Sequence, residues 1–302
     1  MRKEMRKGGP RELQGTASEQ IWRKAISPAR DRVQSELLTG SVGMLLIAKA
    51  VIEVWQLHGA GALPGWFWIA CGVSAGFALL VWLLRSATGP AAALGGVICL
   101  NILLRQGLGV NWQETAMPAL LALFILTFAA TRFGRSRKEA LGTAEARRGR
   151  KAAQVLANLG VAGLCSAAGS TALMAACIAT LAEAAADTVS SEMGQALAGT
   201  RLGTALLITT GQPVKAGTDG AVSVAGTAFG VAAAAGVVLL SPFAHAPALV
   251  VAAVFGAACV GLIFDSLLGA TVETRGWLGN DLVNFTSTVF AAAIAYAAVR
   301  LL

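Results

Sequence analysis

Three acidic residues in apolar stretches are the first candidates for chemistry in this sequence. Glu183 and Asp187 are four residues apart, so a helix places both carboxylates on one face, and Asp265 ends another apolar stretch. Charged groups at membrane depth are costly and call for a function, although each carboxylate could instead pair with a nearby Arg or Lys. Carboxylate oxygens suit Mg²⁺, which shares its ligands with phosphate. We therefore predict that Glu183, Asp187 and Asp265 hold Mg²⁺.

A loop rich in glycine and threonine, 207–220, offers groups that can surround a phosphate. Glycines permit close approach of backbone N–H groups, hydroxyls donate hydrogen bonds, and Lys215 supplies positive charge. The groups assigned to phosphate binding here are Gly217, Thr218, Gly220 and Ser223. Neither GxxxxGK[ST] nor GxGxxG occurs in the sequence, so a plain turn is the alternative.

A basic loop, 132–152, leads into a polar pair at the start of the next apolar segment. Arg132 and Lys138 precede a predicted helix whose N-terminus also favours anions. Membrane topology alone explains most of the cations in this loop. Gln154 and Asn158 are one helical turn apart, however, and an amide pair that enters lipid needs partners.

The composition requires a membrane as the main solvent. Hydrophobic residues make up 56% of the chain, charged residues make up 13%, and the mean hydropathy is +0.66, whereas a soluble domain has about 25% charged residues. These values exclude a disordered chain, a coiled coil and a disulfide scaffold. The net charge of +8 would suit nucleic-acid binding, but the charges occur in clusters between apolar stretches, so we expect no nucleic-acid partner.

The apolar stretches predict an all-α polytopic membrane protein with about nine transmembrane helices. The candidate segments are 37–57, 66–84, 90–105, 117–131, 153–168, 171–189, 222–241, 246–268 and 282–301. Four of them are short or interrupted, so the number could fall to seven or eight. With the N-terminus in the cytoplasm, the inside segments hold 21 of the 24 Lys and Arg residues, as the positive-inside rule requires. Both histidines, His58 and His245, fall in outer loops.

Charge and side-chain size divide the chain into four regions. They are a basic cytoplasmic arm at 1–36, a lipid-facing region of four bulky helices at 37–131, the basic loop at 132–152, and a catalytic region rich in small residues at 153–302. We expect the arm to lie against anionic lipid. Small residues allow close helix packing, as in Gly226-x-x-x-Gly230, and Lys49 and Glu53 can neutralise each other one turn apart.

The predicted topology brings the polar sets to one inner interface. The sets are 132–158, 183–192, 209–223 and 265–284. Carboxylates for a divalent cation beside lysine, arginine and a glycine-threonine loop are what phosphoryl transfer requires.

At these residues the sequence resembles an integral-membrane family that contains the plant phytyl-phosphate kinase and mammalian transmembrane protein 19. The resemblance covers about 130–302. Its blocks are Thr131-Arg-Phe-Gly134 with Lys138, Gln154-Val-Leu-Ala-Asn158, Leu181-Ala-Glu-Ala-Ala-Ala-Asp-Thr-Val-Ser-Ser-Glu-Met-Gly194, Gly217-Thr-Asp-Gly-Ala-Val-Ser223, Asp265-Ser-Leu-Leu-Gly-Ala270 and Asn280 to Asn284. Val189 stands where the family usually has tryptophan, and Glu273 where glutamine is common.

The resemblance implies a Mg²⁺-dependent kinase in the cell's inner membrane. It would transfer the γ-phosphate of CTP or another NTP to an isoprenoid monophosphate such as phytyl phosphate. Lys215, Lys138 and Arg132 would offset the transferring charge, with Asp187 and Asp265 as the other catalytic residues. Donor and acceptor would be oriented by Gln154, Asn158, Thr218, Asp219 and Asn284.

Other functions remain open from the sequence. A transporter also places ionisable residues in membrane helices, but near the midplane and often in repeated halves. A prenol kinase or a lipid cytidylyltransferase would share the nucleotide and the metal but differ in acceptor or product. A purely structural membrane protein leaves the inner-face carboxylates unexplained. The sequence does not determine the oligomeric state, and a homo-oligomer is compatible with it.

Overall fold

The computed structural model describes residues 26–59, 61, 63–104, 114–144, 149–166 and 170–302. Within these ranges the protein is all-α apart from one short hairpin. The helices are α2 (Pro28–Gly59), α3 (Gly65–Leu83), α4 (Gly89–Leu104), α5 (Met117–Arg132), α6 (Arg135–Leu141), α7 (Ala152–Cys165), α8 (Thr171–Ala196), α9 (Val224–Leu239), α10 (Ala248–Leu268) and α11 (Asn280–Leu301). The shorter elements are the 3-10 helices η2 (Arg201–Gly203) and η3 (Pro242–His245), the strands β1 (Leu206–Leu207) and β2 (Ala221–Val222), and the π-helical η4 (Gly269–Glu273).

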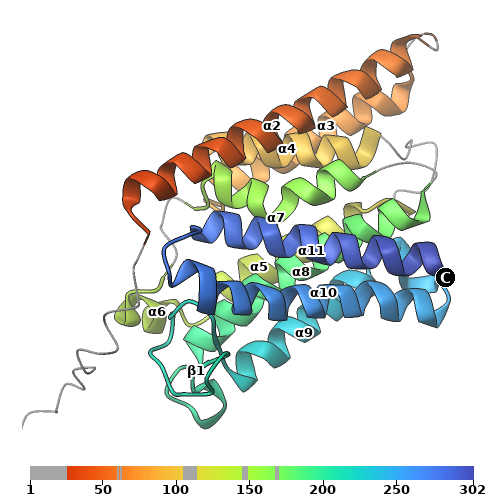
Figure 1. Ribbon diagram of the computed structural model, residues 1–302. Coiled ribbons are helices and arrows are strands. Elements are labelled where there is room, and N and C mark those ends of the chain that lie inside the picture. Colours follow the sequence, from red (N-terminus) through yellow and green to blue (C-terminus); the bar gives the residue numbers. More distant parts are fainter. Residues whose placement is uncertain (1–25, 60, 62, 105–113, 145–148, 167–169) are drawn as a thin grey trace, which may run out of the picture.

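Each apolar segment expected from the sequence corresponds to one helix of this bundle (Figure 1). Among the described residues, five helices are long and apolar enough to cross a membrane: α2, α3, α8, α10 continued by η4, and α11. The pair α5 and α6, bent by 63°, would make a sixth crossing, whereas α4, α7 and α9 are shorter. The all-α membrane class is therefore confirmed, and nine crossings remain a prediction.

The last part of the basic arm expected at 1–36 is helical. Residues 1–25 lie outside the described residues, but α2 already begins at Pro28 and includes the rest of the predicted arm. The reason is that 28–36, although polar, is continuous with the apolar stretch after it and extends the same helix. Arg147 and Arg148 of the basic loop also lie outside the described residues.

Helix α8 forms the centre of the bundle. It packs against α5, α7, α9, α10 and α11, and 83% of the residues in its most apolar 18-residue stretch are buried. Its small side chains permit this close approach. A Cβ at Gly230 of α9 would lie 2.7 Å from the Ala186 carbonyl oxygen, and one at Gly226 would lie 2.6 Å from the Ser190 carbonyl oxygen. The expected close packing at Gly226 and Gly230 is thus confirmed, and it rigidly positions the residues of α8.

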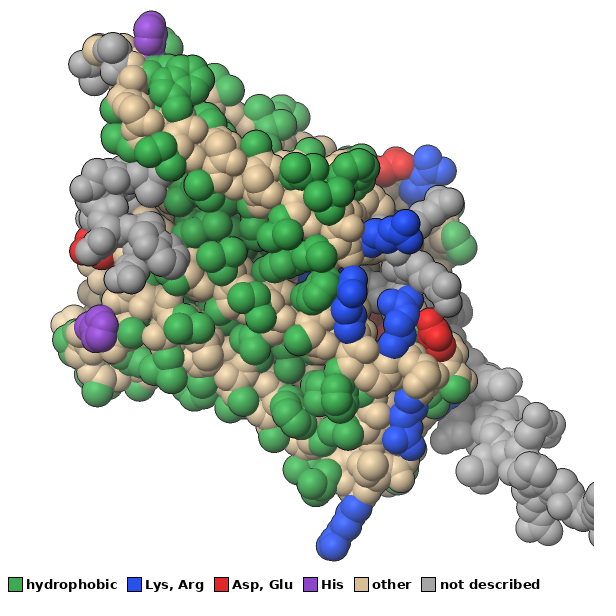
Figure 2. All heavy atoms as spheres, turned by 180° about the vertical axis from the view of Figure 1, so that it is seen from behind, with side chains coloured by type: hydrophobic (Ala, Val, Ile, Leu, Met, Phe, Trp, Pro, Cys, Tyr) green, Lys and Arg blue, Asp and Glu red, His purple; other side chains and the backbone are tan. Residues whose placement is uncertain are grey.

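The outer surface has one polar end and an apolar flank. Figure 2 shows hydrophobic side chains over the flank, with the Lys and Arg side chains at one end and the histidines at the other. Trp55, Trp68 and Trp82 are exposed on α2 and α3, as expected of a lipid-facing surface. Inside the flank, Lys49 pairs with Glu53 at 3.1 Å and also donates to Asn101 Oδ1 at 3.1 Å. The location of the cation-rich end in the cytoplasm remains a prediction.

Candidate functional site

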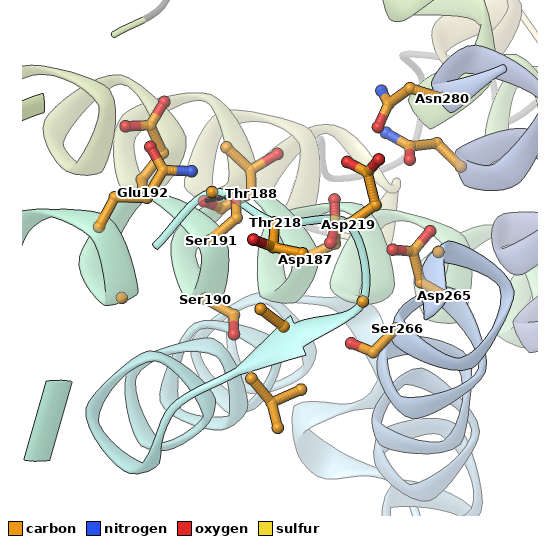
Figure 3. Close-up of a pocket in the computed structure, with 18 of the residues that line it drawn as sticks. Asp187, Thr188, Ser190, Ser191, Glu192, Thr218, Asp219, Asp265, Ser266 and Asn280 are labelled. Atoms are coloured by element: carbon orange, nitrogen blue, oxygen red, sulfur yellow. Dashed lines mark hydrogen bonds between the residues drawn. The ribbon is translucent and has the colours of Figure 1, made fainter. Parts of the chain in front are cut away.

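A cavity of about 370 Å³, here called the polar cavity, opens where the ends of α7, α8, α10 and α11 meet the loop between η2 and α9 (Figure 3). The predicted site residues that line it are Gln154, Asn158, Asp187, Gly217, Thr218, Asp219, Gly220, Ser223, Asp265 and Asn284. They come from all of the polar sets defined from the sequence. The predicted convergence of those distant segments is therefore confirmed.

Two carboxylates from different helices are neighbours in this cavity. Asp187 comes from α8 and Asp265 from the end of α10, and both side chains line the polar cavity. Ser287 of α11 donates a hydrogen bond to Asp265 Oδ1 at 3.1 Å. Figure 3 shows both side chains together with Asp219 of the loop. Because α8 is held on all sides, the position of Asp187 relative to Asp265 is set by helix packing rather than by a mobile loop.

The glycine loop closes the polar cavity through contacts that leave no room for side chains. Strands β1 and β2 pair in antiparallel fashion at its base. Gly220 has a φ of +71° and lies against the backbone of Ala270 in η4, with which a Cβ would overlap. Gly217 has a φ of +82°, and its Cβ would lie 2.5 Å from Thr143 Cγ2. These glycines are required by close contacts with the protein's own groups, and the predicted approach of their backbone to a phosphate stays a prediction.

Several polar groups of the site also stabilise local structure. The Thr218 hydroxyl donates to the Lys215 carbonyl at 2.7 Å, and Ser223 Oγ accepts from the Gly226 amide at the start of α9. Gln154 Oε1 accepts from the Lys151 amide at 2.7 Å, and Asn158 Nδ2 donates to the Gln154 carbonyl. The amide pair of α7 thus has backbone partners and still lines the cavity.

The structure does not bring the three predicted cations to the polar cavity. Lys138 is 1% exposed, and its ammonium donates to Glu192 Oε2 and to the carbonyls of Ala130 and Thr131. Its three N–H groups are therefore used inside the protein. Arg132 lies over the Phe128 ring at 4.1 Å, and Lys215 is exposed, with only its neighbours Ala216 and Gly217 lining the cavity. The three cations that the sequence analysis assigned to this site therefore do not line the polar cavity.

Among the described residues, Arg150 is the cation that lines the polar cavity, and the sequence analysis did not assign it to the site. Its amide donates to the Ser86 carbonyl at 2.9 Å, and its carbonyl accepts from the Thr88 amide at 3.0 Å, so the turn after α3 fixes its backbone. Its guanidinium donates to Thr188 Oγ1 at 3.4 Å. Gly149 has a φ of +77°, and its Cα abuts the backbone of Ser86. The signal in the sequence that could have indicated this position was the Gly149-Arg150 pair shortly before α7.

Glu183 does not share the predicted metal site. It is 1% exposed, does not line the polar cavity, and its Oε1 has no hydrogen-bond partner among the described residues. Within the same part of the chain, no three His, Cys, Asp or Glu side chains are arranged to hold an ion. The three-carboxylate site is therefore not formed, because Glu183 lies one helical turn deeper than Asp187. Asp187 and Asp265 remain the carboxylates available to a cation.

The lining of the polar cavity has an excess of acids. Among its described residues, five carry carboxylates and one carries a positive charge. The acids that the sequence analysis had not assigned to the site are Glu192, which pairs with Lys138, and Glu273 of η4. A nucleoside triphosphate alone would be repelled by this lining, whereas a divalent cation would be attracted. Since Mg²⁺ typically uses one or two carboxylates, waters and substrate phosphates, the lining fits it without an all-protein cage.

A family model described as "Integral membrane protein DUF92" matches residues 72–292. The chain belongs to this family. It is an integral membrane protein with multiple apolar helices, as the sequence predicted. The match begins within α3, so it includes α4 and α5 as well as the small-residue helices that carry the polar cavity.

Curated relatives come from distant organisms. The chain is 35% identical over 192 residues to an uncharacterized membrane protein of Synechocystis, which covers 58% of this chain and 70% of that protein. It is 34% identical over 179 residues to an uncharacterized membrane protein of Methanocaldococcus jannaschii, covering 58% and 72%. It is 30% identical over 203 residues to the chloroplastic protein VTE6 of Arabidopsis thaliana, covering 62% and 60%. No solved structure shows significant similarity.

Proposed function

We propose that this DUF92 protein is a kinase that transfers the γ-phosphate of CTP or another NTP to an isoprenoid monophosphate, such as phytyl phosphate. The observation that carries the proposal is the polar cavity, where Asp187, Asp265 and Arg150 meet a glycine loop at the polar end of an apolar bundle. The resemblance to the family of the plant phytyl-phosphate kinase and the similarity to VTE6 support it.

The chemistry needs little from the protein beyond charge and position. A monophosphate oxygen of the acceptor forms a bond to the γ-phosphorus, while the bond from this phosphorus to the β,γ-bridging oxygen breaks. The nucleoside diphosphate leaves with the electron pair. A phosphate monoester has a second pKa near 6, so at neutral pH the acceptor oxygen is already an anionic nucleophile and needs no histidine base.

The residues of the polar cavity divide into groups that neutralise charge and groups that orient. Asp187 and Asp265 would hold Mg²⁺, which when bound supplies positive charge to the nucleotide phosphates. Arg150 lies where its guanidinium can offset charge on the transferring group. The loop with Gly217 and Thr218 would cover the phosphates. Gln154, Asn158 and Asn284 would orient donor and acceptor.

The place of the polar cavity suits two substrates of opposite solubility. Arg150 and the polar loop line it, and Figure 2 shows an apolar flank with the Lys and Arg side chains gathered at one end of the bundle. A water-soluble nucleotide and a lipid phosphate can meet there without either substrate crossing the membrane. We place this end on the cytoplasmic side of the cell's inner membrane, in accord with the distribution of Lys and Arg.

The test incubates detergent-purified protein with Mg²⁺, each NTP in turn, and phytyl or geranylgeranyl monophosphate. Mass spectrometry should show an acceptor heavier by one phosphoryl group, and Asp187→Asn should lose at least about 100-fold in rate. The matched control is Glu36→Gln, which removes an exposed carboxylate that does not line the polar cavity. It should turn over like the wild type.

Each other product would replace the proposal with a different function. Addition of a nucleotidyl group would indicate a lipid cytidylyltransferase, and comparable turnover of free phytol would indicate a prenol kinase. Uptake of solute by liposomes that contain the protein, with no nucleotide turnover, would indicate a transporter. Asp187→Asn as active as wild type would remove this carboxylate from the metal role.

A further inference from the structure

A second cavity, of about 520 Å³, lies between α3, α4, α5 and α7 and is here called the apolar cavity. Phe77, Leu120, Leu123 and Phe124 are among the side chains of its walls. Leu120 and Arg132 both line it and are twelve residues apart in α5, so it extends along roughly 18 Å of helix. The region of the first four helices, expected to face lipid, therefore also lines a cavity.

The polar groups of the apolar cavity are concentrated at the end nearest α6. Its lining includes four arginines: Arg85, Arg132, Arg135 and Arg150. They come from the turn after α3, the end of α5, the start of α6 and the approach to α7. None of the described residues that line it is acidic. Guanidinium groups recognise phosphate through bidentate hydrogen bonds. An apolar chamber with an arginine end is complementary to a molecule with a hydrocarbon chain and an anionic phosphate head.

Some of these arginines also make contacts within the protein, and these contacts hold them at the cavity. Arg132 lies 4.1 Å from the Phe128 ring centroid and donates to the Leu84 carbonyl, while Arg135 pairs with Glu139 at 3.0 Å. A guanidinium carries five N–H donors, so one such contact leaves others for a phosphate. Arg85 stands at a φ of +55°, the one positive φ among the described non-glycine residues. The turn that holds it is the one that also fixes Arg150.

Helix α7 separates the apolar cavity from the polar cavity. Gln154 and Asn158, four residues apart, line the polar cavity, whereas Val155 and Leu159 line the apolar cavity. Arg150, two residues before α7, lines both. A phosphate held at the arginine end is therefore close to the start of α7, whose N-terminus favours anions, and shares Arg150 with the polar cavity.

We propose that the apolar cavity binds the acceptor, with its isoprenoid chain among α3, α4, α5 and α7 and its monophosphate among the four arginines. Arg150 then contacts the acceptor phosphate on one side and the nucleotide phosphates on the other. This inference rests on the proposed kinase and adds where its lipid substrate lies. The isoprenoid chain then lies mainly against α3, α4 and α5, and the nucleotide against α8, α10 and α11.

The test uses phytyl monophosphate with a photoreactive diazirine near the far end of the chain, bound to the full-length protein in detergent. After irradiation, mass spectrometry should place the label on α4 and α5, within 89–104 and 117–132. Gly95→Leu should reduce labelling about tenfold or more. A Cβ at Gly95 meets only Phe77 Cε1, at 3.9 Å, so the added side chain fills the cavity without a backbone clash. Leu123→Trp is a second filling variant.

The matched control is Gly236→Leu in α9, where a Cβ would meet Leu126 Cδ1 at 3.7 Å and which lines neither cavity. It should label like the wild type. Label on α10 or α11, undiminished labelling in both filling variants, or equal labelling by the phosphate-free alcohol would overturn the proposal. Labelling in 89–104 without turnover of any nucleotide would support the lipid site and contradict the proposed kinase activity. Turnover with the label elsewhere would support the kinase activity and contradict the lipid site.

Discussion

The Lys138 ammonium and the Glu192 carboxylate form a buried ion pair, with 2.5 Å between Nζ and Oε2, that ties α6 to α8 beside the polar cavity. Lys138 lies just beyond the 63° bend between α5 and α6, and its remaining hydrogen bonds go to carbonyls at the end of α5. The pair therefore fixes the bend against the central helix. A lysine that the sequence assigns to catalysis has a structural role here.

We expect Lys138→Met to destabilise the protein by about 3–5 kcal/mol, because it leaves the buried Glu192 carboxylate without its partner. Adding Glu192→Gln should restore part of this loss, since the remaining group is then uncharged. Thermal unfolding in detergent measures both variants. A Lys138→Met protein with wild-type stability and no turnover would instead return this lysine to catalysis.

We expect Mg²⁺ to bind weakly to the protein alone and tightly only together with a nucleotide. Asp187 and Asp265 supply carboxylates, but in the described part of the chain no three His, Cys, Asp or Glu side chains are arranged to hold an ion, so nucleotide phosphates must complete the coordination. Titration calorimetry with Mg²⁺, with and without a nonhydrolysable NTP, measures the difference. Asp265→Asn should abolish the nucleotide-dependent binding. Tight Mg²⁺ binding without nucleotide, unaffected by that substitution, would contradict the assignment.

We expect Arg150→Gln to reduce kcat/KM by about 100-fold, equivalent to roughly 2.7 kcal/mol of transition-state stabilisation. The reason is that Arg150 lines both cavities and its backbone is fixed by the turn after α3. Arg150→Lys should retain part of the rate because it keeps the charge. The matched control is Arg201→Gln, an exposed arginine of η2 that lines neither cavity. If both glutamine variants lose activity equally, the effect is a general loss of positive charge.

We expect Gly220→Ala to raise the KM for nucleotide at least about tenfold, because a Cβ there overlaps the backbone of Ala270 and must push the loop away from η4. Gly211→Ala is the control within the same loop. Gly211 also has a positive φ, +66°, but a Cβ there meets nothing within 4 Å. This control therefore measures backbone strain alone, about 1 kcal/mol. Equal KM values for the two variants would show that contact with η4 does not position the loop.

Much of the fold follows from apolar runs in the sequence. Burial of a long apolar run in lipid requires a helix, since every backbone group must be paired internally. The segments chosen on that basis correspond to α2–α5 and α7–α11, and those around Glu183 and Asp265 correspond to α8 and α10. The number of membrane crossings did not follow as securely, because α4, α7 and α9 are too short to be assigned by length.

The sequence by itself determined the membrane class, the family and the meeting of distant polar segments at one end, because charged groups in lipid are costly wherever the chain places them. It could not rank the cations, since the positive-inside rule applies to Lys138, Arg132 and Arg150 alike. Only the tertiary structure decided that Lys138 is buried in an ion pair while Arg150 lies between two cavities. That choice depends on helix rotation, the bend after α5 and the backbone contact between 86–88 and Arg150, none of which leaves a local pattern in the sequence.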